Sequence, residues 1–347
     1  MLAATRRWFN RNRTPLAVGV GIVGAGYVAT QYVLSKLSDA RERMSSDRIA
    51  KENLRRRFEQ NQEDCTFTFA PEVIMHSRSQ DEEQVRDHYD RGDDFYGWFL
   101  GPRMIYTSGV ISDIDREETL EEMQDNKLAI VCEKIGLQPG DTLLDMGCGW
   151  GTLARFASEF YGAKATGVTL GRNQTAWGNN AMRKAGIPEE QSKIVCCDYR
   201  DTPTVPGGYK KITCLEMGEH VGVRHFPAFL KQMHDLLDDD GVCYFQLAGL
   251  RKYWQYEDLI WGLFMNKYVF PGADASTPLG FYIDRFEGAG FEVRNIDTIG
   301  VHYSGTLWRW YRNWLANKDK VEAKYGKRWF RVSFSSFIFI CSVADYL

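Results

Sequence analysis

The order of apolar and polar positions divides this chain into an N-terminal part and a longer, regularly alternating part. Short apolar runs predict strands at 142–145, 165–169, 193–197, 211–216 and 241–247, and segments with helical spacing predict helices at 152–161, 173–185 and 226–237. This alternation predicts an α/β fold with a doubly wound, mostly parallel sheet. Ligands bind such sheets at the carboxyl ends of the strands, near the point where the strand order reverses.

A single apolar run near the N-terminus predicts a membrane anchor that precedes the α/β fold. Residues 14–35 carry no charge, and about twenty helical residues span the ~30 Å hydrocarbon layer. No small-residue cleavage site follows a short apolar core, so an anchor is favoured over a cleaved signal. Gly19-x-Gly21-x-x-Gly24 imitates a dinucleotide loop, but no strand leads into it.

Composition narrows the classes of function. Lys and Arg number 43 and Asp and Glu 46, so the net charge of −3 gives no basic excess for nucleic acid. Aromatic residues make up 14% of the chain. This fraction fits either a core rich in aromatic side chains or an apolar site for a hydrophobic or cationic ligand. The eight cysteines form no C-x-x-C pair. We expect buried, reduced thiols in a cytosol-facing domain and no metal site.

The strongest local signal is a glycine-rich turn after the first strand of the sheet. Gly147, Gly149 and Gly151 occupy every second position after the acidic strand end at Asp145, whereas a dinucleotide loop places its third glycine one residue later. Glycines let the backbone approach a ligand, and the helix N-terminus that follows favours a carboxylate. We therefore predict S-adenosyl-L-methionine as the cofactor, with its ammonium group at Asp145.

The ends of the next two strands supply further candidates for cofactor binding. The second strand ends in Thr169 and Leu170 instead of an acid, so Thr169 and Gln174 would hold the ribose hydroxyls by neutral hydrogen bonds. After the third strand, Asp198 can accept a hydrogen bond from the adenine amino group, and Tyr199 can flank the adenine ring.

Motifs between residues 85 and 330 resemble the cyclopropane fatty-acid synthase and mycolic acid methyltransferase superfamily. They lie at 88–90, 94–96, 104–108, 143–151, 167–170, 198–200 and 219–222. Segments 254–267, 270–278 and 302–308 resemble, more narrowly, the fungal sphingolipid C9-methyltransferases. The resemblance implies a class I S-adenosylmethionine methyltransferase domain that methylates carbon 9 of the sphingoid base of ceramide or glucosylceramide. It also places Tyr106 and Thr107 beside the cofactor.

The N-terminal segment is similar to a different family. Residues 54–69, behind a basic start and one apolar span, resemble the N-terminus of the third peroxin. This implies a peroxisomal membrane, whereas the enzyme family implies the endoplasmic reticulum. We expect a basic tail at 1–13, the anchor at 14–35, a charged helix and linker at 36–84, and the methyltransferase domain at 85–330. Residues 331–347 depart from the family pattern, and 336–343 are strand-prone.

The implied acceptor is an alkene, which must attack the sulfonium methyl in a tightly aligned, dry site. Aromatic faces can stabilise the carbocation that results, which then loses a proton. Cyclopropane synthases hold a bicarbonate with a cysteine, a glutamate, a histidine and a tyrosine, and the resemblance places Ser108, Glu219, Gln246 and Tyr303 at these positions. Because Ser108 and Gln246 are replacements, we expect a methyl-branched alkene instead of a ring, with Glu219 or a water as proton acceptor.

Several alternatives stay open at the level of sequence. Glu219 could instead stabilise the N-terminus of the next helix. Trp254, Trp261, Phe264, Tyr268 and Phe270 fall at helical spacing and fit a core stripe, an acyl-chain groove or a membrane-facing lid. Other functions compatible with the sequence are a cyclopropane synthase, a small-amine N-methyltransferase, and an inactive membrane adaptor with a relic domain.

Overall fold

The computed structural model describes residues 77–89, 91–249, 252, 262–263, 265, 269–270, 273 and 277–344. The expected basic tail, the anchor at 14–35 and nearly all of the charged linker lie outside these described residues. Within them, no helix combines the length and apolar character needed to cross a bilayer.

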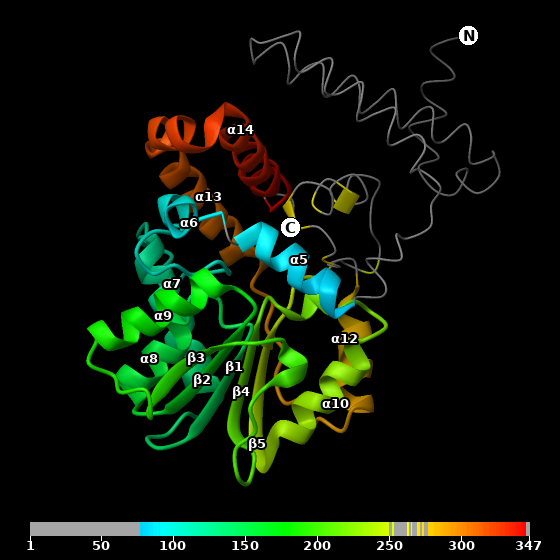
Figure 1. The fold of residues 1–347 in the computed structure, drawn as a ribbon. Coiled ribbons are helices and arrows are strands. Elements are labelled where there is room, and N and C mark those ends of the chain that lie inside the picture. Colours follow the sequence, from blue (N-terminus) through cyan, green and yellow to red (C-terminus); the bar gives the residue numbers. More distant parts are fainter. Residues whose placement is uncertain are drawn as a thin grey trace, which may run out of the picture. The chain divides into compact units, whose positions relative to one another are not determined.

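Five strands form the central sheet (Figure 1). They are β1 (Thr142–Met146), β2 (Lys164–Thr169), β3 (Ser192–Cys196), β4 (Tyr209–Leu215) and β5 (Leu237–Gln246). Their order is β3-β2-β1-β4-β5, and every neighbouring pair is parallel. The chain runs outward from β1 to β3 and then returns to β4, so the strand order reverses between β1 and β4. The predicted doubly wound parallel sheet is confirmed.

Helices cover both faces of the sheet. Successive side chains of a strand point to opposite faces, so each strand contributes apolar side chains to both layers of helices. On one face lie α7 (Leu120–Lys134), α8 (Thr152–Tyr161) and α9 (Arg172–Lys184), and on the other lie α10 (Phe226–Leu236) and α12 (Leu279–Gly288) (Figure 1). Leu143 of β1 belongs to the first core with Val131 and Ala154, whereas its neighbour Leu144 belongs to the second core with Phe229. The sheet is therefore buried on both sides, as parallel sheets are.

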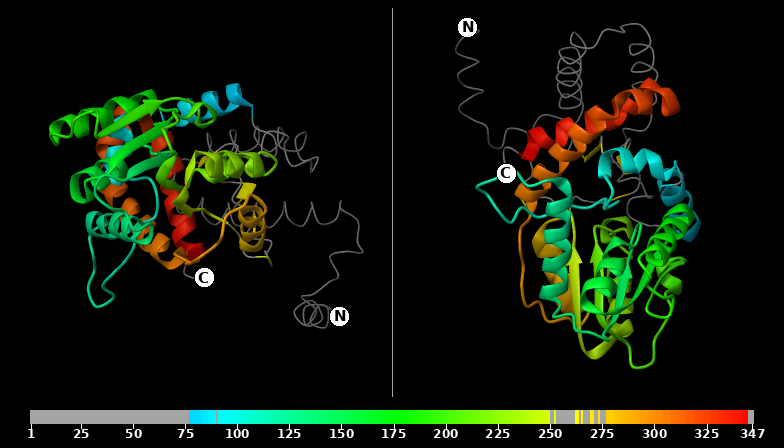
Figure 2. Two further views of the ribbon diagram at one scale, coloured as in Figure 1. Left: turned by 90° about the horizontal axis from the view of Figure 1, so that it is seen from below. Right: turned by 90° about the vertical axis from the view of Figure 1, so that its left-hand side faces the viewer.

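A helical cap lies beyond the carboxyl ends of the strands (Figures 1 and 2). It consists of α5 (Arg78–Tyr89), α6 (Asp93–Leu100), α13 (Gly300–Ala316) and α14 (Lys318–Ala344). Its core is aromatic, and its buried members include Phe95, Phe99, Trp310 and Trp314. Trp150, in the turn after β1, donates its indole N–H to Asp93 at 2.8 Å. The cap is thus fixed directly over the edge where a ligand is expected.

Two expectations about local structure are wrong. Residues 336–343, which the sequence marks as strand-prone, belong to the long helix α14, which is kinked at Gly326 (φ 84°). The strand preference of Phe and Ile depends on context, and extending an existing helix adds one hydrogen bond per residue fixed. Among the described cysteines, Cys132 and Cys214 are buried as expected, but Cys196 is exposed.

Candidate active site

The glycine-rich turn adopts a backbone conformation that favours glycine at all three predicted positions. Gly147, Gly149 and Gly151 have φ values of 72°, 54° and 73°. A Cβ on Gly147 would lie 2.5 Å from Met217 Cγ, and one on Gly151 would lie 2.0 Å from Ile194 Cδ1. At Gly149 the nearest atom would be Gln174 Nε2, at 3.9 Å. The middle of the turn is therefore the part that a ligand can approach.

The structure brings the candidates after β2 to this same turn. The Thr169 hydroxyl donates to Gln174 Oε1 at 2.7 Å, and the Gly171 N–H donates to the Thr169 hydroxyl at 3.3 Å. Thr169 and Gln174 are both buried, and Leu170 between them is half-buried. Neutral hydrogen-bonding groups thus lie beside Gly149, where the sequence analysis expects ribose hydroxyls.

Asp145 lies at the centre of the sheet, aligned with Gly167 of β2 on one side and with Thr213 of β4 on the other. Its carboxylate is 3% exposed and accepts a hydrogen bond from the Thr213 hydroxyl at 2.9 Å. Burial raises the pKa of Asp145 to about 6, against the hydrogen bond from Thr213 and the charge of Lys127. Its proposed contact with an ammonium group stays a prediction.

The candidates after β3 are held by Arg200, to which the sequence analysis gave no role. Asp198 accepts hydrogen bonds from the Arg200 backbone N–H at 2.9 Å and from its guanidinium at 2.8 Å. The guanidinium lies over the Tyr199 ring, 4.5 Å from its centroid, and also bonds Asp81 of α5 at 2.7 Å. Tyr199 itself is buried and packs against Phe229. Arg200 therefore ties the cap helix α5 to the predicted adenine edge.

Three of the four predicted catalytic residues converge on a carboxylate that the sequence analysis missed. Glu216 Oε1 accepts from the Ser108 backbone N–H at 3.0 Å and from the Gln246 side-chain amide at 2.5 Å, and the Tyr303 hydroxyl also hydrogen-bonds this carboxylate. The Ser108 hydroxyl points elsewhere and donates to the Gly109 carbonyl at 2.8 Å. An acid directly after β4, beside the reversal of strand order, was the signal that could have identified Glu216.

Glu219, the fourth predicted catalytic residue, lies in the short helix η3 (Gly218–His220) and is 6% exposed. Its Oε1 accepts from the Ala248 N–H, whereas its Oε2 has no hydrogen-bonding partner among the described residues. Burial raises the pKa of Glu219 to about 8, against the bond from Ala248, and the charge of Glu216 raises it further. Because α10 begins only at Phe226, Glu219 does not occupy the first turn of that helix.

Aromatic rings surround the two carboxylates. The His88 and Tyr106 rings lie 5.3 Å and 5.7 Å from Phe270, and Tyr89 lies 6.1 Å from Trp150. Burial raises the pKa of Tyr89 and of Tyr106, and the charge of Glu216 adds to this in both. Burial also lowers the pKa of His88 to about 3, so that this imidazole is neutral.

We call these rings and carboxylates the aromatic–carboxylate cluster, which we define as His88, Tyr89, Tyr106, Glu216, Glu219, Phe270 and Tyr303. Phe270 is the one described member of the predicted aromatic stripe; Trp254, Trp261, Phe264 and Tyr268 lie outside the described residues. The aromatic–carboxylate cluster therefore combines apolar faces with buried charge. Among the described residues, no three His, Cys, Asp or Glu side chains are grouped so that they could hold a metal ion.

A buried lysine links the cofactor candidates to the carboxylates. Lys127 of α7 is 2% exposed, and its ammonium group donates to the Thr107 hydroxyl at 2.7 Å. Burial lowers the pKa of Lys127 to about 8, against the attraction of Glu216 and Asp145. Lys127 therefore supplies the positive charge between these two acids. The sequence analysis missed it, although its place among the apolar positions of α7 marked it as unusual.

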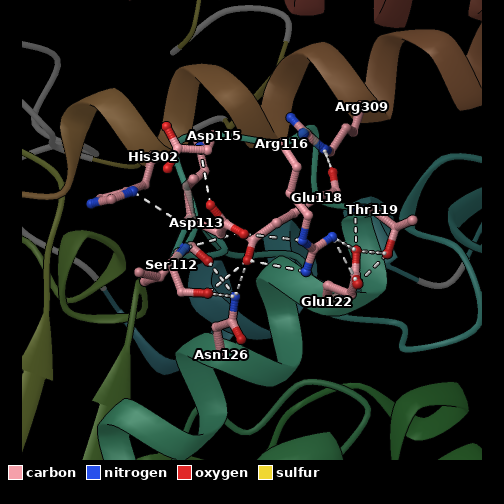
Figure 3. Close-up of polar contacts among 12 residues, drawn as sticks. Ser112, Asp113, Asp115, Arg116, Glu118, Thr119, Glu122, Asn126, His302 and Arg309 are labelled. Carbon is pink, nitrogen blue, oxygen red and sulfur yellow. Dashed lines mark hydrogen bonds and ion pairs between the residues drawn. The ribbon is translucent and has the colours of Figure 1, made fainter.

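The segment from Ser108 to α7 is tied to α13 by a polar network (Figure 3). The Glu118 carboxylate is 2% exposed and accepts from the Ser112 N–H at 2.9 Å and from its hydroxyl at 2.6 Å. Arg309 of α13 donates to the Glu118 carbonyl at 2.6 Å, and the Ile111 N–H donates to His302 Nδ1 at 3.1 Å. The network thus holds Ser108 in place against the helix that carries Tyr303.

Comparison with known sequences decides the family. The sequence model of the mycolic acid cyclopropane synthetase family matches residues 76–344. The chain belongs to this family. A second family model, that of Peroxin-3, matches residues 7–71. Both resemblances expected from the sequence are thereby confirmed.

Three curated relatives of this mycolic acid cyclopropane synthetase family member come from fungi. Sphingolipid C9-methyltransferase 2 of Gibberella zeae is 79% identical over 266 residues, which cover 77% of this chain and 51% of that protein. Sphingolipid C9-methyltransferase A of Emericella nidulans is 76% identical, with 77% and 52% covered. Sphingolipid C9-methyltransferase of Candida albicans is 68% identical, and the match covers 76% of this chain and 52% of that protein. The chain spans about half the length of these relatives.

Solved structures of the same family share the fold. The cyclopropane synthase MmaA2 from Mycobacterium tuberculosis superposes with a TM-score of 0.69 at 26% identity, covering 76% of this chain and 92% of that one. The mycolic acid cyclopropane synthase CmaA1, solved in complex with SAH and CTAB, gives a TM-score of 0.67 at 26% identity, with 78% and 93% covered. The predicted class I methyltransferase fold is thereby confirmed.

Proposed function

We propose that this protein is an S-adenosylmethionine-dependent lipid methyltransferase that methylates carbon 9 of the sphingoid base of ceramide or glucosylceramide. The observation that carries the proposal is the 67–79% identity to curated proteins named sphingolipid C9-methyltransferase. This identity extends over 77% of the chain for Sphingolipid C9-methyltransferase 2 and over 76% for the Komagataella phaffii enzyme.

The glycine turn fits the proposed cofactor, because its middle residue leaves the backbone open to a ligand. Among the described residues, a Cβ on Gly149 would come within 4 Å of the Gln174 amide alone, and Thr169 hydrogen-bonds that same amide. Gly147 and Gly151 shape the turn, and Asp198 lies at the end of β3 for the adenine. When bound, S-adenosylmethionine supplies an electrophilic methyl group on a positively charged sulfur.

The aromatic–carboxylate cluster suits an alkene as the acceptor of that methyl group. An alkene has no proton to lose first, so the protein contributes alignment and exclusion of water instead of a base for the first step. The faces of Tyr106 and Phe270 are suited to a transient carbocation. A buried carboxylate is suited to accept the proton that leaves. The saturated tail of a lipid matches the apolar character of these rings.

The test uses the full chain in membranes with radiolabelled S-adenosylmethionine and ceramide or glucosylceramide that carries an 8-alkene. We expect a product one methylene heavier whose proton NMR spectrum shows a methyl branch on a retained double bond. Cofactor binding without a product on either lipid would reject the substrate.

A cyclopropane synthase is the second candidate, favoured by the family match over residues 76–344. The same NMR spectrum separates the two candidates, because a cyclopropane gives ring protons upfield and no vinyl signal. Failure to bind S-adenosylmethionine in calorimetry, by folded protein, would instead support an inactive membrane adaptor.

The location of the protein is a further proposal. We propose that residues 14–35 anchor the chain in a membrane with the methyltransferase domain facing the cytosol. The match to Peroxin-3 over residues 7–71 supports the peroxisomal membrane, whereas the enzyme family favours the endoplasmic reticulum. A fluorescent fusion should co-localise with one of these membranes and resist carbonate extraction. A variant that lacks residues 1–35 and stays in the membrane fraction would contradict the anchor.

A further inference from the structure

The bicarbonate held by cyclopropane synthases does not fit the side chains as they are arranged in this chain. Of the four residues at the corresponding positions, Gln246 and Tyr303 direct their side-chain donors at Glu216, and Ser108 directs its backbone N–H there as well. The Ser108 hydroxyl is used by the Gly109 carbonyl. The donors that would bind the anion are thus already occupied by a carboxylate of the protein. A bicarbonate beside Glu216 would also meet a like charge.

Hydrogen bonding decides which of the two neighbouring acids carries the negative charge. Glu216 accepts from three groups and is attracted by Lys127, whereas Glu219 accepts backbone N–H groups alone, and its Oε2 has no partner within the described part of the chain. Two buried carboxylates that repel one another do not both ionise readily. Burial raises the pKa of Glu216 as well, but the hydrogen bonds and Lys127 oppose this rise. The better hydrogen-bonded Glu216 is therefore the anion, and Glu219 holds the proton, in agreement with its pKa of about 8.

We propose that the Glu216 carboxylate takes the place of the bicarbonate and accepts the proton that leaves the methylated alkene. The proposal rests on the proposed function. The alkene electron pair forms the bond to the methyl carbon at carbon 9 as the carbon–sulfur bond breaks, which leaves a thioether and a cation at carbon 8. The electron pair of the C–H bond at carbon 9 then restores the double bond between carbons 8 and 9, and the proton passes to the Glu216 carboxylate. The sulfonium cation and the carboxylate anion become a neutral thioether and a neutral carboxylic acid, so the charge balances.

The backbone at Glu216 supports a dedicated role. Its φ is 53°, in the left-handed region that residues with side chains rarely adopt. Strain of this kind persists where the surroundings hold it in place, and it is concentrated at functional sites. Here the Glu216 N–H donates to the Gln246 carbonyl at 2.7 Å while the two side chains also bond each other. The carboxylate is therefore fixed at both its backbone and its side chain.

The same strain provides an informative variant. Glycine tolerates a positive φ, so Glu216→Gly removes the carboxylate without a backbone penalty and frees the three donors around it. Glu216→Gln keeps the volume of the side chain and removes its basicity. Glu117→Gln is the matched control, because Glu117 is an exposed acid that pairs with Arg312 on the surface.

The experiment measures methyl transfer by the full chain in CO₂-free buffer, with and without added sodium bicarbonate. We expect a wild-type rate that is independent of bicarbonate, and a rate of Glu216→Gln that is about 10²–10⁴-fold lower, the usual size of a general-base effect. Glu216→Gly should be equally slow and regain at least about tenfold with bicarbonate. The control should match the wild type, and calorimetry should show that all variants still bind S-adenosylmethionine.

Three results would overturn the proposal: a wild-type rate that requires bicarbonate, a Glu216→Gln rate within tenfold of the wild type, or no bicarbonate rescue of a Glu216→Gly variant that still binds the cofactor. A wild-type protein that transfers no methyl group to any alkene lipid would instead refute the proposed function.

Discussion

Alanine substitutions in the glycine turn should differ in cost, because the three glycines have different neighbours. In Gly151→Ala the new Cβ would meet Ile194 Cδ1 at 2.0 Å and Cγ1 at 2.9 Å, at a φ of 73°. The left-handed backbone costs about 1–2 kcal/mol for a residue with a Cβ, and overpacking a filled core costs about 1–3 kcal/mol. Gly151→Ala should therefore lower the free energy of unfolding by about 2–5 kcal/mol.

Gly149→Ala is the matched control, because its φ of 54° brings similar backbone strain but its Cβ would meet nothing closer than 3.9 Å. It should lose only about 1–2 kcal/mol, and its defect should appear in cofactor affinity instead. Ile194→Val removes the clashing Cδ1, so the double variant Gly151→Ala/Ile194→Val should be more stable than the sum of the two single changes predicts.

Urea unfolding followed by tryptophan fluorescence measures these differences, and calorimetry with S-adenosylmethionine measures affinity. The reasoning is wrong if the two alanine variants are equally destabilised, or if the Ile194→Val change is purely additive with Gly151→Ala. Either result would mean that contact with Ile194 does not set the cost at Gly151.

Three further predictions concern the buried polar groups. Glu219 has a folded pKa of about 8, above its unfolded value, so its ionisation should lower the free energy of unfolding as pH rises from about 4.5 through 8. Glu219→Gln should reduce this loss in urea titrations at several pH values. An unchanged dependence of stability on pH would contradict the assignment. Glu118 has a lowered pKa, because the hydrogen bonds from Ser112 and Asn126 outweigh its burial, so it contributes stability above its unfolded pKa that is lost on acidification; Glu118→Gln should be less stable than wild type at neutral pH, and the two should converge in acid. Gln246→Leu removes a donor to Glu216 and should raise the pKa of that carboxyl, which moves the acid limb of the pH–rate profile to higher pH; a limb that stays in place would show that Glu216 does not titrate in the reaction.

The order of strands and helices could be predicted from the sequence because each element has a local pattern. The predicted helix at 152–161 has the observed bounds of α8, and the three glycines of the turn have the positive φ that their pattern suggested. Local patterns were misleading only where context overrides them, as at 336–343, which is helical.

The chemical centre could not be predicted in the same way. Ser108, Glu216 and Tyr303 are each separated by more than eighty residues in the chain, and Ser108 contributes a backbone N–H, which no residue type reveals. The resemblance named Ser108, Glu219, Gln246 and Tyr303 and expected Glu219 or a water as the proton acceptor, without naming Glu216. Only the folded arrangement shows that the side chain of Glu216 lies among them.

Arg200 links the predicted adenine contact to the attachment of the cap. Its guanidinium bonds Asp198 and Asp81 at the same time, so the acid expected to receive the adenine and the acid that secures α5 share one cation. Replacing this single side chain would therefore disturb both the orientation of Asp198 and the anchorage of α5.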